Sequence, residues 1–260
     1  MPGWRTDWAV RLLAAGLVLL ILLSGCTPAA TELPPTPTST LTPTATPTVV
    51  WFPATATPSP QPTSQPSPTS EVRPALGEVI FSDGFTSAGD WPVGSLPAGN
   101  IALGDRRLTL AISQAGGTLS ALRGQPALQN GYIEIIATPS LCRSADQYGL
   151  LFRAASVMDT YRLLLRCDGQ VRLERLNNGR IKILQDWLPS ADVPQGAPGT
   201  ARIGIWMQGT EIKVFVADAL QFSVTDDGFS SGQMGLFARS GGDTAVSVAF
   251  SGLTVWALAP

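Results

Sequence analysis

The side chains available for chemistry in this chain are carboxylates, arginines, tryptophans and three cysteines, because the sequence contains no histidine. Without histidine there is no Ser-His-Asp triad, no histidine metal ligand and no histidine pH switch. With 17 basic and 19 acidic residues the net charge is −2, so the basic excess typical of nucleic-acid-binding proteins is missing. We therefore expect no nucleic-acid partner.

Arginines and one tryptophan are the candidates for ligand contacts. Arg153, Arg162 and Arg166 lie on or beside strand-like segments, where a basic face could bind an anionic polysaccharide or another acidic surface. Trp187 lies near an expected loop, where an exposed ring could stack on a sugar. The alternative is a solvated sheet face, in which the arginines form cross-strand pairs with carboxylates such as Glu174.

Acidic side chains in expected loops offer only a weak metal site. Asp83 and Asp227 could supply oxygen ligands to Ca²⁺. Their spacing matches no EF-hand, and aspartates also shape turns by accepting hydrogen bonds from the backbone. The sequence thus requires no cofactor, and calcium stays an open alternative.

Residues 1–25 are typical of an export signal. Arg5 and Arg11 precede an apolar run over residues 12–23. A membrane-spanning helix needs about 20 apolar residues, whereas the apolar part of a signal peptide has roughly 7–15. The run ends in Leu23-Ser24-Gly25-Cys26, which resembles the lipobox of bacterial lipoproteins. This resemblance implies diacylglycerol on the Cys26 thiol and a protein held outside the cytoplasm, anchored to the cell membrane.

Residues 26–74 carry no pattern that could build a core. Proline, threonine and serine dominate them, and such a composition buries too little apolar surface to offset the entropy of ordering the chain. We interpret this segment as the lipidated cysteine followed by a disordered tether, and residues 75–260 as one globular domain.

Cys142 and Cys167 remain as a pair once Cys26 is assigned to the lipid. Disulfides persist in exported proteins, so we predict a bond between these two cysteines. The alternative is two separate buried thiols.

The globular domain has the pattern of an all-β protein. Short runs of β-branched and aromatic residues recur between turn residues such as Asp168-Gly169 and Asn178-Gly179, and no helical period persists. Several runs alternate polar and apolar side chains, which predicts a two-sheet antiparallel sandwich. Trp206 and Trp256, in apolar strand contexts, are expected in its core. The ten expected strands cover residues 101–111, 132–137, 148–154, 160–167, 170–176, 180–185, 201–207, 211–216, 233–238 and 245–255.

Four motifs in this domain carry a family resemblance through their order and spacing. They are Phe81-Ser82-Asp83-Gly84-Phe85, Asn130-Gly131-Tyr132-Ile133-Glu134, Tyr148-Gly149-Leu150-Leu151-Phe152-Arg153 and Asp227-Gly228-Phe229. The domain resembles the concanavalin A-like lectin/glucanase jelly rolls, in particular the laminin-G-like and 3-keto-disaccharide-hydrolase-like domains of exported bacterial proteins. The resemblance implies a jelly roll over residues 78–258. Members of this group bind glycans, hydrolyse them or contact other proteins, so the fold leaves the function open.

Glucanases of this group carry a Glu-x-Asp-x-x-Glu strand, whose carboxylates share one face for retaining hydrolysis. That pattern is absent from this sequence, and the strand at residues 132–137 holds Glu134 alone. We therefore expect a non-catalytic domain that binds a carbohydrate or a surface polymer. A structural or protein-interaction role in the cell envelope is the alternative, and a sugar-active hydrolase or lyase that uses Glu134 is a weaker one.

Overall fold

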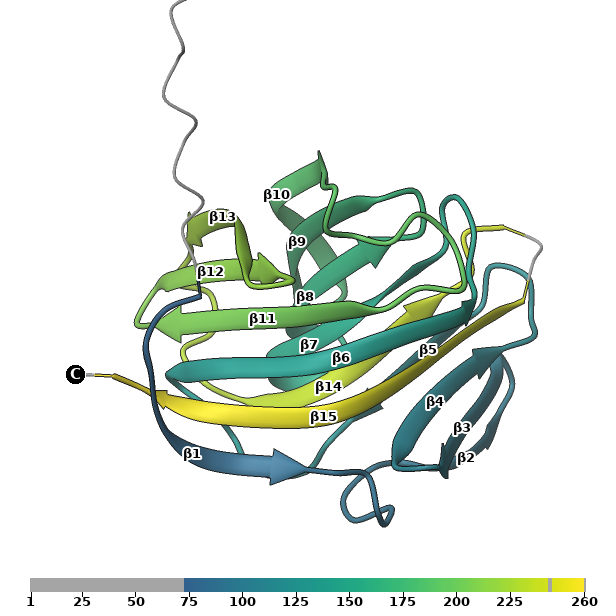
Figure 1. The fold of residues 1–260 in the computed structure, drawn as a ribbon, viewed down its shortest axis with the longest axis horizontal. Helices are drawn as coiled ribbons and strands as arrows, with labels where there is room; N and C mark the ends of the chain where they lie inside the picture. The colour runs from purple at the N-terminus through teal and green to yellow at the C-terminus, as the bar shows by residue number, and fades with distance from the viewer. Residues whose placement is uncertain (1–72, 243–244, 260) are drawn as a thin grey trace, which may run out of the picture. The chain divides into compact units, whose positions relative to one another are not determined.

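Two antiparallel sheets form the part of the chain that the computed structural model describes, residues 73–242 and 245–259 (Figure 1). The architecture is the expected all-β jelly-roll sandwich. No helix in these residues is long and apolar enough to cross a membrane. The export signal, Cys26 and the tether up to residue 72 lie outside the described residues.

The larger sheet has nine strands. They are β1 (Leu76–Asp83), β2 (Gly94–Leu96), β3 (Gly99–Gly104), β4 (Arg107–Ile112), β6 (Gly131–Leu141), β11 (Ala201–Gln208), β12 (Glu211–Val216), β13 (Ala219–Thr225) and β15 (Val246–Leu258). Their order is β13-β12-β11-β6-β15-β4-β3-β2, and β1 pairs with β15 beside this path. Strands far apart in the sequence, such as β6 and β15, therefore lie side by side (Figure 1).

The smaller sheet has six strands in the order β10-β9-β8-β7-β14-β5. They are β5 (Thr118–Leu122), β7 (Gln147–Ser156), β8 (Asp159–Arg166), β9 (Gln170–Asn177), β10 (Arg180–Pro189) and β14 (Gln233–Arg239). Strands β7 to β10 follow one another as hairpins, so a continuous segment of the chain builds most of this sheet.

Period-2 alternation along the strands divides the side chains between the core and the outer faces. In β8, Tyr161, Leu163 and Leu165 are buried in the core between the sheets. Arg162 and Arg166 alternate with them and keep 13% and 22% of their side-chain surface exposed. The core thus takes one set of alternating residues and leaves the other set for the outer face.

The structure divides one expected strand and adds others. Residues 101–111 form two strands, β3 and β4, because Asp105 and Arg106 turn the chain with φ values of 52° and 56°. Ala217 and Asp218 likewise form the turn between β12 and β13, with φ values of 50° and 68°. Hairpin turns of this kind usually contain glycine or asparagine, so the sequence signal for both is weak.

Cys142 and Cys167 form the predicted disulfide, with their Cα atoms 5.8 Å apart. Cys142 follows β6 and Cys167 follows β8, so the bond joins the two sheets. Asp146 supports the same corner. Its carbonyl oxygen accepts the Cys167 N–H at 3.0 Å, and its buried carboxylate accepts the Arg143 N–H at 2.9 Å.

Candidate functional site

Arg162, Arg166 and Trp187 lie together on the outer face of the six-stranded sheet. Arg172 and Glu174 of β9 join them, because both alternate with the core residues of their strand. Trp187 is part of β10 and does not lie in the expected loop. We call this surface the Arg/Trp face.

The register of the strands brings these residues side by side. One row of cross-strand partners crosses the Arg/Trp face through Arg239, Gln147, Arg166 and Gln170. The next row runs through Phe237, Gly149, Leu164 and Arg172. Each row draws on β14, β7, β8 and β9, so no single segment of sequence contains the site.

An apolar floor lies beneath the arginines. Leu151, Leu164 and Phe237 form a buried cluster separate from the main core, and Trp187 packs against it. The Arg162 guanidinium lies 4.6 Å from the centre of the Phe237 ring. The cluster is buried although it belongs to an outer face, because long arginine side chains cover apolar surface with their stems.

Aromatic and ionic contacts hold the arginines in place. The guanidinium carbons of Arg166 and Arg172 lie 4.6 and 5.5 Å from the centre of the Trp187 ring, within the range of cation–π attraction. Glu174, whose side chain is 2% exposed, accepts hydrogen bonds from Arg162 and pairs with Arg172 at 3.2 Å. The cross-strand pair of Arg162 with Glu174 is the one that the alternative reading of the sequence expects.

The Arg/Trp face has an excess of hydrogen-bond donors. Its arginines are Arg162, Arg166, Arg172 and the exposed Arg239, whereas its carboxylates are Glu174 and Asp168. A guanidinium with unused N–H groups binds carboxylates and hydroxyl oxygens with defined geometry. The surface can therefore recognise a ligand rich in acceptor oxygens.

Arg153 lies apart from the other candidate arginines. It has a φ of 46°, and the register of β7 shifts beside it, so a β-bulge turns its side chain away from the Arg/Trp face. The residue is 1% exposed. Its guanidinium donates hydrogen bonds of 2.7–3.2 Å to the carbonyl oxygens of Gln129, Gly209 and Phe229. Arg153 ties three loops together and is not part of the candidate site.

The aspartates considered for calcium lie apart. Asp83 already uses both carboxylate oxygens, since one accepts the Phe85 N–H at 2.8 Å and the other accepts Trp91 Nε1 at 2.9 Å. Arg123 also contacts Asp83, at 3.4 Å, whereas Asp227 is exposed. Within residues 73–242 and 245–259, no three acidic or cysteine side chains are grouped as metal ligands. We therefore assign no calcium ligands.

Glu134 and two tryptophans occupy the outer face of the other sheet. Glu134 pairs with Arg73 at 2.9 Å. Trp206 and Trp256 are only partly buried and flank Tyr132 in register, so the expectation that they lie in the core is wrong. Their sequence neighbours supply the core instead, because side chains alternate along β11 and β15.

Phe237 and Arg239 complete the site beyond the predicted residues. Alternation within β14 places these side chains on an outer face. That signal is readable from the sequence, but it does not say which strands are neighbours. The pairing of β14 with β7 could not be read from the sequence, because 86 residues separate their first positions.

Comparisons with known proteins support the fold. No protein-family model matches this sequence, and no curated protein matches it. A Bacillus subtilis protein of unknown function with a galectin-like fold is similar, with a TM-score of 0.53 and 15% identity over 70% of this chain and 97% of that chain. SCLam, a non-specific endo-β-1,3(4)-glucanase of family GH16, aligns with a TM-score of 0.53 and 9% identity over 74% of this chain and 98% of its own. A variant of LamA from Z. galactanivorans, in complex with laminaritriose and laminaritetraose, aligns with a TM-score of 0.50 and 14% identity over 70% and 100% of the two chains. The described domain therefore shares the jelly-roll fold of galectin-like proteins and glucanases.

Proposed function

We propose that this protein is a lipid-anchored carbohydrate-binding protein whose Arg/Trp face contacts the glycan. The observation that carries the proposal is the convergence of Trp187 with Arg166 and Arg172 on one outer sheet face. The arginines stacked on the indole ring offer fixed donors for sugar oxygens, and the indole adds apolar surface and an N–H donor.

The arginines of this face are already ordered before a ligand arrives. Trp187 holds Arg166 and Arg172 by stacking, and Glu174 holds Arg162 and Arg172 by ion pairs. A ligand that binds such side chains loses less free energy to their ordering. SCLam and LamA, which share the fold, are named for glucan cleavage or seen with glucan oligosaccharides, and this supports a saccharide as the ligand class.

Binding without hydrolysis fits the carboxylates of the Arg/Trp face. A retaining glycosidase needs two carboxyl groups about 5 Å apart, of which one attacks and the other transfers a proton. Glu174 is buried under two arginines, and Asp168 pairs with Arg166 at 2.6 Å. Glu134 belongs to the other sheet and pairs with Arg73. We therefore propose a binding role and no catalytic one.

The lipid anchor is the second part of the proposal. Cys26 would hold the protein at the outside of the cell membrane, and the tether would present the domain to a glycan. The described chain begins at Arg73, whose backbone N–H donates to Asp218 at 3.1 Å beside β12 and β13 of the nine-stranded sheet. This entry point is not on the Arg/Trp face, so attachment there is compatible with glycan binding.

Replacing the central tryptophan tests the binding role. Titration calorimetry of the purified full chain with the neutral glucan oligosaccharide laminarihexaose should show binding. In Trp187→Ala we expect that affinity to fall about tenfold or more, because aromatic anchors dominate binding energy at such surfaces.

Trp206→Ala is the matched control. Trp206 is also half-buried on a sheet face and has the Lys213 ammonium 5.1 Å from its ring centre, but it lies on the nine-stranded sheet. We expect Trp206→Ala to bind the saccharide with the affinity of the wild type. Equal losses in both variants, or a glycan array without any binding, would refute the proposal. Capture of a defined envelope protein through the same face would favour the structural role instead.

A further inference from the structure

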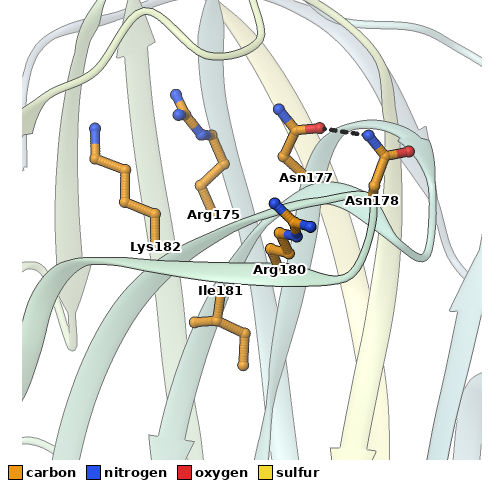
Figure 2. Close-up of a pocket in the computed structure, with 6 residues that line it drawn as sticks. All are labelled: Arg175, Asn177, Asn178, Arg180, Ile181 and Lys182. Atoms are coloured by element: carbon orange, nitrogen blue, oxygen red, sulfur yellow. Dashed lines mark hydrogen bonds between the residues drawn. The ribbon is translucent and has the colours of Figure 1, made fainter.

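A second polar site lies on the opposite face of the β9–β10 hairpin. Cross-strand pairing sets Arg175 beside Lys182 and Asn177 beside Arg180. Figure 2 shows these four side chains projecting to one side of the hairpin, while Ile181 points to the other. Together with Asn178 they line a hollow of about 590 Å³. We call it the hairpin hollow.

A buried carboxylate from the other sheet anchors one wall of the hairpin hollow. Asp226, in the loop after β13, pairs with Arg175 and accepts a hydrogen bond from Lys182 at 2.7 Å. Its side chain is 1% exposed, and Tyr161 and the Gly228 N–H donate to it as well, at 2.7 and 3.0 Å. A Cβ at Gly228 would lie 1.9 Å from the Arg175 guanidinium, so the glycine leaves the space that Arg175 needs. Two of the cations are thus held at fixed positions.

Several donors around the hairpin hollow remain unused. Arg180 is exposed and takes part in no ion pair among the described residues. The Lys182 side chain is 57% exposed, and its ammonium group has further N–H donors besides the one that contacts Asp226. Asn177 accepts a hydrogen bond from Asn178 at 3.1 Å through its side-chain oxygen, which leaves its amide N–H groups free.

The charge balance of the hairpin hollow is positive. Arg175, Arg180 and Lys182 line it, and Asp226 is the carboxylate that pairs with two of them. Asp159 accepts the Asn178 N–H at 2.7 Å near the hairpin turn, and the three cations exceed the two carboxylates by one charge. Arginine, lysine and amide donors around one space form a typical oxyanion site.

The size and polarity of the hairpin hollow further restrict the class of ligand that it can bind. A volume of about 590 Å³ exceeds what one inorganic anion fills and falls within the range of pockets for small organic ligands. Ile181 is the one apolar residue among the described residues that line it, and its side chain points to the other side of the hairpin (Figure 2), so a lipid chain would find little apolar surface. A sugar ring that carries an anionic group satisfies both limits.

We propose that the hairpin hollow binds the carboxylate or sulfate group of an acidic saccharide. Arg180 and Lys182 supply the donors to the anion, and Asn177 and Asn178 contact the ring hydroxyls. The site goes beyond the proposed role of the Arg/Trp face, because it uses different residues on the other side of the hairpin. Either of the two proposed sites can therefore be refuted without the other.

Titration calorimetry of the full chain tests this site with trigalacturonate, which carries carboxylates, and with a sulfated κ-carrageenan trisaccharide. The measurement uses the Trp187→Ala variant as its parent, so that binding at the Arg/Trp face does not contribute to the measured affinity. We expect Arg180→Gln to weaken the binding of the preferred acidic trisaccharide about tenfold and to reduce its salt dependence, since one charged donor is removed. The tighter of the two trisaccharides identifies the anion.

Arg107→Gln is the matched control, because Arg107 is also an exposed strand residue without a described ion pair. We expect it to bind as the Trp187→Ala parent does. Equal affinity of the Arg180→Gln and Arg107→Gln variants would overturn the proposal. Neutral maltotriose binding as tightly as the acidic trisaccharides would also overturn it. The same holds if inorganic sulfate or phosphate binds as tightly as an acidic trisaccharide. Binding that depends on Arg180 but not on Trp187 would support this site even if the proposed function of the Arg/Trp face fails.

Discussion

Asp226 shows how one buried side chain connects the two sheets. Burial by itself raises the pKa of its carboxyl group. Hydrogen bonds from Lys182, Tyr161 and the Gly228 N–H, together with the charge of Arg175, outweigh burial and bring the pKa below its ordinary value of 3.8. The ionised carboxylate therefore stabilises the folded chain fully at pH values above this ordinary pKa. This contribution is lost as the pH falls through the lower pKa of the folded state.

Replacing this carboxylate should change both stability and its pH dependence. We expect Asp226→Asn to lower the free energy of unfolding at neutral pH by about 3 kcal/mol, because Arg175 and Tyr161 lose an ionised partner. Urea unfolding between pH 2 and 7 should then show a smaller loss of stability below about pH 4 in the variant than in the wild type. Asp227→Asn, at the exposed neighbouring position, should change stability by less than about 0.5 kcal/mol. An identical pH profile for wild type and Asp226→Asn would contradict this assignment.

Arg153 illustrates why residue type alone does not identify a ligand contact. It lies two positions after Leu151, whose side chain belongs to the apolar floor of the Arg/Trp face, so simple alternation would place it on that face. A positive φ and a shifted register redirect it toward loop carbonyl groups. Burial lowers the pKa of its guanidinium, but carbonyl oxygens satisfy the charge. Such a bulge depends on the partner strand and has no clear signal in the sequence.

At the scale of elements, the site belongs to a sheet built from successive hairpins. The turns at Asp168-Gly169 and Asn178-Gly179 have the glycine that the sequence suggests, with φ values of 85° and 74°. The turns at Asp105 and Ala217 have none; the first divides one expected strand into β3 and β4, and the second precedes β13, which was not expected. Strand type was thus readable wherever turn chemistry was explicit, and boundaries were lost where tertiary pairing forced non-glycine residues to positive φ.

The disulfide is the element-scale feature with the clearest stability prediction. It closes a separation of 25 residues between β6 and β8 and joins the two sheets. Cross-linking a loop of that size stabilises by about 3.5 kcal/mol in the chain-entropy model. We expect the double replacement of Cys142 and Cys167 by alanine to lower the free energy of unfolding in urea by about this amount. A phosphine reductant should destabilise the wild type similarly and leave the double variant unchanged; equal stability of both proteins without reductant would contradict the prediction.

At the scale of the whole molecule, the proposed attachment to the membrane depends on lipid at Cys26. We expect Cys26→Ala to move the protein from the membrane fraction to the soluble fraction and to abolish labelling by an alkyne palmitate analogue, because the thiol is the lipid acceptor. The double alanine variant at Cys142 and Cys167 is the control, and its labelling should persist. Labelling of Cys26→Ala, or a mature N-terminus without lipid in the wild type, would disprove the anchor.

The amino-acid sequence by itself indicated that the described domain is all-β and forms a two-sheet sandwich, and it predicted the pairing of Cys142 with Cys167. The fold follows from period-2 alternation and turn residues, which are local properties of the chain, and the pairing follows from the assignment of Cys26 to the lipid. Only the tertiary structure decided that Trp187 meets Arg166 and Arg172, while Arg153 turns to the loops. The physical reason is that strand order, register and bulges are set by packing between segments distant in sequence, and one residue of slip moves a side chain to the opposite face.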